Sequence, residues 1–456
     1  MSPNSGSKIG SKIGFKVGSL VRVAVLAALT SGFSTQVSAS GFALIENSAS
    51  GQGNAYAGAA AIAEDASTVW FNPAGMMKLN GNQIVVAGHF IDPDSKFTNE
   101  GSTNADGSLI GGDVDDGGRS AFVPNVYWVT AINDEMKFGL GITAPFGLET
   151  DYDDTWVGRY HAVNSDLRTV NFNPSLAFKM TDKVSVGVGL NILIADVTLT
   201  NAVDFGALLG APGTADGFVE LEGDNFDGLS GLGYGWNIGL MYDITSETTL
   251  GVAFRTEMDV DVNGTGKFKV PAAAAPVLSS GAFVPSTGLD ASITLPQSLS
   301  VSVAHDMSTV TLLADVTWTG WSSFKELRID FDNPSQPDGL TTEEWDNTLR
   351  YSVGADWRYS NKITLRTGVA YDESPVPNSE RRTARIPGND RTWLSFGGTY
   401  IISPEFTIDV GYSHLFISDT KINNAFESSQ AALNSTLKGT YEASVDILSA
   451  QLRWNY

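Results

Sequence analysis

The chain has 456 residues, with 51 Asp and Glu against 28 Lys and Arg, a formal net charge of −23 and no cysteine. This acidic balance excludes nucleic acid as a partner, because phosphate backbones are bound by basic surfaces. With no disulfide to staple the chain, burial and hydrogen bonding must hold its fold together.

Residues 1–39 have the pattern of a secretory signal peptide. Four basic residues, and no acidic residue, precede the apolar run Val23–Leu29: Lys8, Lys12, Lys16 and Arg22. The small residues Val37 and Ala39 follow the run. This order predicts export and cleavage after Ala39. An N-terminal membrane anchor is the alternative, but no longer apolar helix follows the run.

Residues 40–82 are rich in Ala, Gly and Ser and lack the alternation of a membrane-spanning strand. They nevertheless contain large apolar residues such as Tyr56, Trp70 and Met76, which require burial. We therefore expect a small helical hatch packed inside the following domain, in preference to a disordered periplasmic tail. The segment "TVWFNPAGMMKL", Thr68–Leu79, places a proline-fixed turn near the end of this hatch.

Residues 83–456 alternate with period two. In "VSVGVGLNILIA", from Val184 to Ala195, apolar residues occupy the even positions. Fourteen such segments follow one another, and an even number suits a closed up-and-down barrel. Connections after even-numbered segments are short and those after odd-numbered segments are long, which is typical of outer-membrane barrels. The sequence therefore predicts an all-β fold, a 14-stranded antiparallel transmembrane β-barrel plugged by the N-terminal hatch.

The last segment ends "LSAQLRWNY", with aromatic residues on one face. Such an end resembles the signal read by the barrel-assembly machinery, which is an expected partner. Upstream, the apolar residues shift to the positions of Val445 and Ile447. This shift predicts either a β-bulge or an apolar patch in the lumen.

Several quoted segments, in this order along the chain, resemble the FadL-type long-chain fatty acid transporters of Gram-negative outer membranes. They are "GFALIENSASGQGNAYAGAAAIAEDASTVWFNPAGM", "PNVYWVTAINDEMKFGLGITAPFGL", "WVGRYHA", "GYGWNIGLMY", "TWTGWSSFKEL" and "RTGVAYDESPVPNSERRTARIPGNDRTWLSFGGTY". The resemblance implies capture of a hydrophobic ligand by extracellular loops and its binding inside the barrel. It further implies a sideways exit at a kink in the third strand, next to the Asn-Pro-Ala motif of the hatch.

The gate implied by this resemblance consists of seven residues: Asn72, Pro73, Ala74, Thr143, Pro145, Gly147 and Gly239. Pro145 has no N–H for the strand ladder, so we expect a local break there. The Asn72 amide, with two donors and an acceptor, is predicted to fill that break. The ordinary alternatives are a bulge at Pro145, simple packing at Gly239 and a generic Asn-Pro turn.

Candidate ligand contacts are cationic or apolar residues in outward-facing stretches and at the start of the hatch: Phe42, Arg159, His161, Phe205, Leu208, Leu209, Arg328, Arg385 and Arg391. The cations would hold a carboxylate, unless neighbouring acids or lipopolysaccharide phosphates pair with them. The apolar residues would form a binding surface, unless the loops pack on one another. The end of the fifth strand carries Asp196 and Asp204 where some family members have a basic residue, so an aromatic hydrocarbon or an alkane is the alternative ligand.

No cofactor and no metal site is predicted, because the four histidines are scattered and the acidic loops resemble solvated surface. An enzyme is not expected either, since the alternative of an outer-membrane lipase lacks a nucleophile signature. A structural barrel or adhesin is the remaining alternative. We expect a monomer in the outer membrane, surrounded by lipid and lipopolysaccharide.

Overall fold

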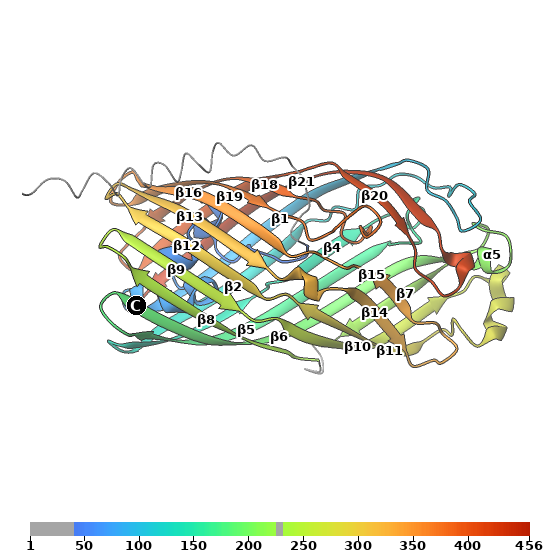
Figure 1. The fold of residues 1–456 in the computed structure, drawn as a ribbon, viewed down its shortest axis with the longest axis horizontal. Coiled ribbons are helices and arrows are strands. Elements are labelled where there is room, and N and C mark those ends of the chain that lie inside the picture. The colour runs from blue at the N-terminus through green and yellow to red at the C-terminus, as the bar shows by residue number, and fades with distance from the viewer. Residues whose placement is uncertain (1–40, 225–230) are drawn as a thin grey trace, which may run out of the picture. The chain divides into compact units, whose positions relative to one another are not determined.

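The computed structural model describes residues 41–224 and 231–456 (Figure 1). The predicted signal peptide lies outside the described residues. Within them, 21 strands form one sheet. The first strand, β1 (Gln83–Asn99), pairs along its whole length with the last, β21 (Thr436–Asn455), and this pairing closes the sheet into a barrel.

The described strands group into fourteen spans of the barrel wall. Seven spans are single strands: β1, β2 (Ala121–Asn133), β5 (Asn164–Lys179), β6 (Val184–Asp204), β17 (Ile363–Asp372), β18 (Arg391–Ile401) and β21. The other seven are each split in two: β3 (Met136–Thr143) with β4 (Gly147–Asp151), β7 (Asp216–Asp224) with β8 (Gly233–Asp243), β9 (Thr248–Arg255) with β10 (Met258–Lys269), β11 (Thr287–Leu295) with β12 (Ser298–Asp306), β13 (Val310–Thr319) with β14 (Glu326–Phe331), β15 (Gly339–Thr342) with β16 (Thr348–Arg358), and β19 (Phe406–Ile417) with β20 (Thr420–Ala425). The predicted 14-stranded antiparallel barrel is therefore confirmed.

The two ends of the barrel differ as the sequence predicted. The turns at the end where the chain terminates are short, and the loops at the other end are long and carry α5 (Phe205–Leu208), η2 (Ala272–Ser280) and η4 (Ala431–Leu433) (Figure 1). Along β16, Tyr351 and Val353 are exposed on the outer face, while Arg350 and Ser352 are buried inside. This alternation gives an apolar outside that suits lipid and a polar lumen. None of the described helices is long and apolar enough to cross a bilayer.

The apolar shift in the last strand does not produce a bulge. The register between β21 and β1 runs without a shift from Gln83↔Asn455 to Asn99↔Gly439. The prediction of a bulge is wrong, and the alternative of an apolar lumen patch is confirmed, because Val445 and Ile447 line an internal cavity.

The chain preceding β1 forms four short helical segments inside the barrel: α2 (Ala49–Gln52), α3 (Ala59–Ile62), α4 (Thr68–Phe71) and η1 (Pro73–Lys78). We call residues 41–82 the hatch. It approaches the wall closely where the wall carries glycine. A methyl group on Gly239 would lie 1.9 Å from Oδ1 of Asn72, and one on Gly251 would lie 1.9 Å from the carbonyl oxygen of Ala60. Glycine at these inward positions lets the hatch backbone reach the wall.

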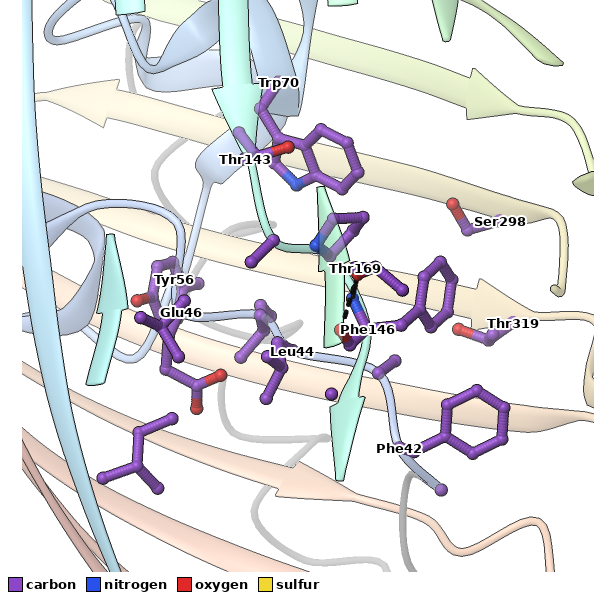
Figure 2. Close-up of a pocket in the computed structure, with 18 of the residues that line it drawn as sticks. Phe42, Leu44, Glu46, Tyr56, Trp70, Thr143, Phe146, Thr169, Ser298 and Thr319 are labelled. Atoms are coloured by element: carbon purple, nitrogen blue, oxygen red, sulfur yellow. Dashed lines mark hydrogen bonds between the residues drawn. The ribbon is translucent and has the colours of Figure 1, made fainter. Parts of the chain in front are cut away.

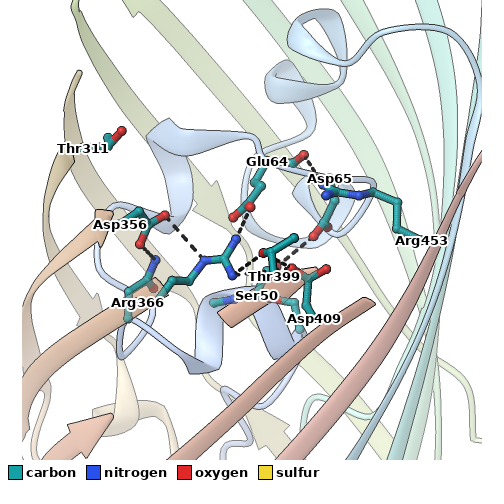
Figure 3. A network of polar contacts seen from close by, with 12 residues as sticks. Ser50, Glu64, Asp65, Thr311, Asp356, Arg366, Thr399, Asp409 and Arg453 are labelled. Atoms are coloured by element: carbon teal, nitrogen blue, oxygen red, sulfur yellow. Dashed lines mark hydrogen bonds and ion pairs between the residues drawn. The ribbon is translucent and has the colours of Figure 1, made fainter. Parts of the chain in front are cut away.

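A buried ion network also fixes the hatch to the wall (Figure 3). The guanidinium of Arg366, on β17, is fully buried and pairs with Glu64 of the hatch. It also lies 3.6 Å from Asp356 and 3.4 Å from Asp409 on neighbouring strands. Arg453 donates to the carbonyl of Glu64 at 3.0 Å. Because one buried cation serves three acids, its removal would leave buried charges without compensation.

Candidate ligand path and wall opening

The third span is interrupted, as the proline predicted. β3 ends at Thr143 and β4 begins at Gly147, with Pro145 between them. β2 pairs with β3 only from Val126 onward, while residues 121–125 of β2 pair only with β1. The wall between the second and third spans is therefore open over this stretch.

The start of the hatch covers the inner side of this break (Figure 2). The Leu44 amide donates to the carbonyl of Pro145 at 2.8 Å, and the Gly147 amide donates to the carbonyl of Phe42 at 3.0 Å. On the other side, the Thr169 hydroxyl donates to the carbonyl of Phe146 at 2.6 Å. Residues 42–44 thus act as a short strand that satisfies backbone groups the broken ladder would leave unpaired.

Asn72 does not fill the break, so that prediction is wrong. Its amide donates to the carbonyls of Ala60 at 2.7 Å and Leu240 at 3.0 Å, and its Oδ1 accepts from the Ala74 amide at 3.1 Å. The Asn-Pro-Ala turn is directed to β6 and β8, since Pro73 and Ala74 lie against Gly187 and Asn72 lies against Gly239.

A cavity of about 840 Å³, the wall cavity, lies behind the break. Its lining includes the inward-facing Val123 and also Phe122, which is 68% exposed on the outer side. The wall cavity therefore reaches the outer face at the interruption. Such a volume is within the range of pockets that hold small organic ligands.

A second, smaller cavity of about 130 Å³, the loop cavity, has a mainly aliphatic lining contributed by strands and loops at the long-loop end. Phe42 lines both cavities. Its ring lies within 6 Å of the rings of Phe146, Trp321, Phe324 and Trp345. This aromatic cluster, with Phe42 at its centre, lies where the linings of the two cavities meet, together with Leu148 and Leu167, which also line both.

The tryptophans of this cluster were missed by the sequence reasoning. Trp321, in η3 (Trp321–Ser323), and Trp345 lie where the ninth and tenth spans are interrupted, and both are almost fully buried. The aromatic motif "TWTGWSSF" and the break in alternation around it are the signal that could have found them.

The wall cavity contains a row of charges beside the hatch. Arg350 and Arg391 flank Asp372 on three adjacent strands, and Arg391 donates to the carbonyl of Gly41 at 3.4 Å. Glu46 of the hatch faces this row, and burial raises the pKa of Glu46 to about 7. Arg391 was a predicted ligand contact; Arg350 was not, although the alternation of its strand placed it in the lumen.

In the loop cavity, Arg385 is the predicted cation that remains without a carboxylate partner within the described residues. It donates to the carbonyl of Asn164 at 2.8 Å and to the Ser165 hydroxyl at 2.9 Å. Burial lowers its pKa to about 10, so it stays charged at neutral pH. His161 also lines this cavity, but burial lowers its pKa to about 4, so it is neutral and cannot hold a carboxylate by charge.

Several other predicted contacts do not fit this geometry. Arg159 lines neither cavity and pairs with Asp216 at 2.8 Å. Arg328 is on the outer face, where it pairs with Glu326 at 2.9 Å. Phe205 is fully buried against other loop residues, so the alternative of loop packing holds for it. The remaining two apolar candidates, Leu208 and Leu209, are half-buried and 46% exposed respectively.

These features define a plugged transmembrane β-barrel with internal cavities, one of which reaches the outer face of the wall. Residues 30–456 match the family model described as outer membrane protein transport protein (OMPP1/FadL/TodX). The chain belongs to this family of transport proteins, which transport hydrophobic compounds across the outer membrane of Gram-negative bacteria.

Individual relatives agree with this assignment. The long-chain fatty acid transport protein of Salmonella typhi is 32% identical over 421 residues, covering 89% of this chain and 94% of the relative. The crystal structure of a Pseudomonas aeruginosa FadL homologue matches with a TM-score of 0.84 at 24% identity, covering 91% of this chain and all of the other. The monoaromatic hydrocarbon channel CymD has a TM-score of 0.64 at 20% identity, covering 91% and 99%. The last two likenesses concern the fold alone.

Proposed function

We propose that this protein takes up long-chain fatty acids, which pass from the loops through the loop cavity and the wall cavity and leave sideways at the break in the third span. The observation that carries the proposal is the combination of apolar lining and buried guanidinium groups. Arg385 in the loop cavity and Arg391 in the wall cavity are both partly buried, and Arg385 has no carboxylate partner within the described residues, whereas Arg391 lies beside Asp372.

Buried charge favours a carboxylate over a hydrocarbon. A buried cation without an ionic partner is costly, and a ligand carboxylate would compensate for part of that cost. An aromatic hydrocarbon or an alkane offers no such group. The relative from Salmonella typhi, the long-chain fatty acid transport protein, supports the same choice.

A route through the wall also suits the ligand. Each CH₂ group of an acyl chain contributes roughly 0.8 kcal/mol when it leaves water. A path from an apolar cavity directly into lipid keeps the chain out of water throughout. On this proposal Phe42 blocks the path between the cavities, and residues 42–44 must move aside before the ligand reaches the break.

Uptake of radiolabelled oleate by a transport-deficient host that expresses the protein tests the proposal. We expect uptake, and we expect Arg385→Ala to raise the half-saturating oleate concentration about tenfold or more, since a hydrogen bond to a charged group contributes about 1.5–3 kcal/mol. Arg328→Ala, on the outer face, is the matched control and should leave uptake unchanged. Uptake of toluene without uptake of oleate would favour the hydrocarbon alternative.

A further inference from the structure

A further guanidinium lines the wall cavity, and nothing described above uses it. Arg255, the last residue of β9, is 9% exposed and stacks on the indole of Trp70, with 3.6 Å between the guanidinium carbon and the ring centroid. Trp70 and Thr143, the last residue of β3, also line this cavity (Figure 2). Arg255, in the seventh span, therefore shares the wall cavity with Thr143 and Pro145 at the break.

Arg255 differs from the other cations of this cavity in its partners. It donates to Oδ1 of Asn191 and, at 2.9 Å, to the carbonyl of Trp70, and it makes no ion pair within the described residues. Arg350 and Arg391, by contrast, flank Asp372. The remaining two arginines of the lining, Arg119 and Arg168, pair with Asp151 and Asp166. The charge of Arg255 is thus compensated only by neutral groups.

The amides around Arg255 form a directed network. Since Asn191 accepts from Arg255 at its Oδ1, its Nδ2 is free to donate, and it does so to Oδ1 of Asn237 at 3.1 Å. Asn173 donates to the same oxygen at 2.9 Å. These two donors fix the orientation of the Asn237 amide and leave its Nδ2 buried without an acceptor.

Asn237 and Arg255 are direct partners across β8 and β9, and both line the wall cavity. The site therefore presents a guanidinium and an unpaired N–H next to one another, in a place that is almost completely buried. Two donors without an acidic neighbour are the arrangement that binds an anion. The unpaired Oδ1 atoms of Asn171 and Asn173 belong to residues that do not line the cavity.

We propose that Arg255 and Asn237 form a second carboxylate site, which holds the head group of the fatty acid while its acyl chain passes through the break. The proposal rests on the proposed function and adds to it a second binding step, in the wall cavity, distinct from Arg385 in the loop cavity. Arg255 would act after loading, so its loss should lower the maximal rate and leave the half-saturating concentration unchanged.

The test compares uptake of oleate with uptake of methyl oleate, which has the same chain without the charge. In Arg255→Ala we expect the maximal rate for oleate to fall on the order of tenfold, with the rate for methyl oleate unchanged. Arg255→Lys should restore part of the oleate rate, because it keeps the charge but not the stacked, planar geometry. Asn237→Leu is expected to lower the oleate rate less than Arg255→Ala does.

Equal losses for both ligands would mean that Arg255 only supports Trp70 and the hatch, and an unchanged oleate rate would mean that it has no part in transport; either result overturns the proposal. Retention of the folded form in unheated gel samples shows whether the variant barrels assemble. If the unaltered protein takes up no oleate, the proposed function itself fails, and the second carboxylate site fails with it.

Discussion

Substitution of Gly239 by alanine should displace the Asn-Pro-Ala turn of the hatch from strand β8. The new methyl group would lie 1.9 Å from Oδ1 of Asn72 and 3.0 Å from Cδ of Pro73, so Asn72 must move. That movement breaks the three hydrogen bonds of its amide, to Ala60, Leu240 and Ala74. At about 1 kcal/mol for each bond, the loss is roughly 3 kcal/mol.

Hydrogen exchange measures this loss in the hatch itself, because local opening sets the exchange rate of a protected amide. We expect the amides of residues 68–79 to exchange on the order of a hundred times faster in Gly239→Ala. Gly141→Ala is a matched control on the inner wall, since its methyl group would find no atom closer than 3.4 Å. The control should leave exchange in the hatch unchanged.

A double-mutant cycle tests the cause. In Asn72→Ala the hydrogen bonds are already lost and the obstructing amide is absent, so adding Gly239→Ala should cost little more. Unchanged exchange in Gly239→Ala, or costs that simply add in the double variant, would refute the reasoning that Asn72 is wedged against β8.

Three further predictions concern the hatch. Phe42→Ala removes the ring at the centre of the aromatic cluster and should speed exchange of the Leu44 and Gly147 amides, a result that unchanged protection would contradict. Burial raises the pKa of Glu46 from 4.5 to about 7. Between these values the packed hatch keeps a proton on Glu46 that a released hatch would lose, so the packing of the hatch against the wall weakens as the pH rises from 4.5 to about 7. Glu46→Gln should therefore slow exchange of residues 41–47 relative to the unaltered protein at pH 8 but not at pH 4.5, and an equal effect at both values would argue against titration of Glu46. Arg366→Met leaves three acids without their cation and should destabilise the protein by about 3–5 kcal/mol, seen as a lower unfolding temperature on heated gels; an unchanged temperature would show that the network contributes nothing.

The barrel was readable from the sequence because its determinants are local. Each span places apolar residues such as Tyr351 and Val353 on alternate positions, and this period does not depend on the neighbouring strand. The break at Pro145 was also predictable, because a proline removes a ladder donor wherever its partner lies. Loop lengths at the two ends can be read directly from the number of residues between consecutive alternating segments.

The partners of the hatch were not readable in this way. The sequence shows that Asn72 needs acceptors and that Pro145 leaves a gap, but the two lie at different strands of the closed wall. Arg159 and Arg385 both belong to loops and look alike in the sequence, yet one pairs with Asp216 and the other lines a cavity.

By itself, then, the sequence determined a closed fourteen-stranded barrel with an apolar outside, an interior hatch and a break in the third span, because periodicity and proline chemistry act over a few residues. Only the tertiary structure decided which groups meet inside the barrel: residues 42–44 at the break, Asn72 against Gly239, and Arg255 beside Asn237. Those contacts depend on how the hatch, which has only short helices, folds back against strands that lie up to hundreds of residues away in the sequence. A local sequence pattern carries no information about such long-range contacts.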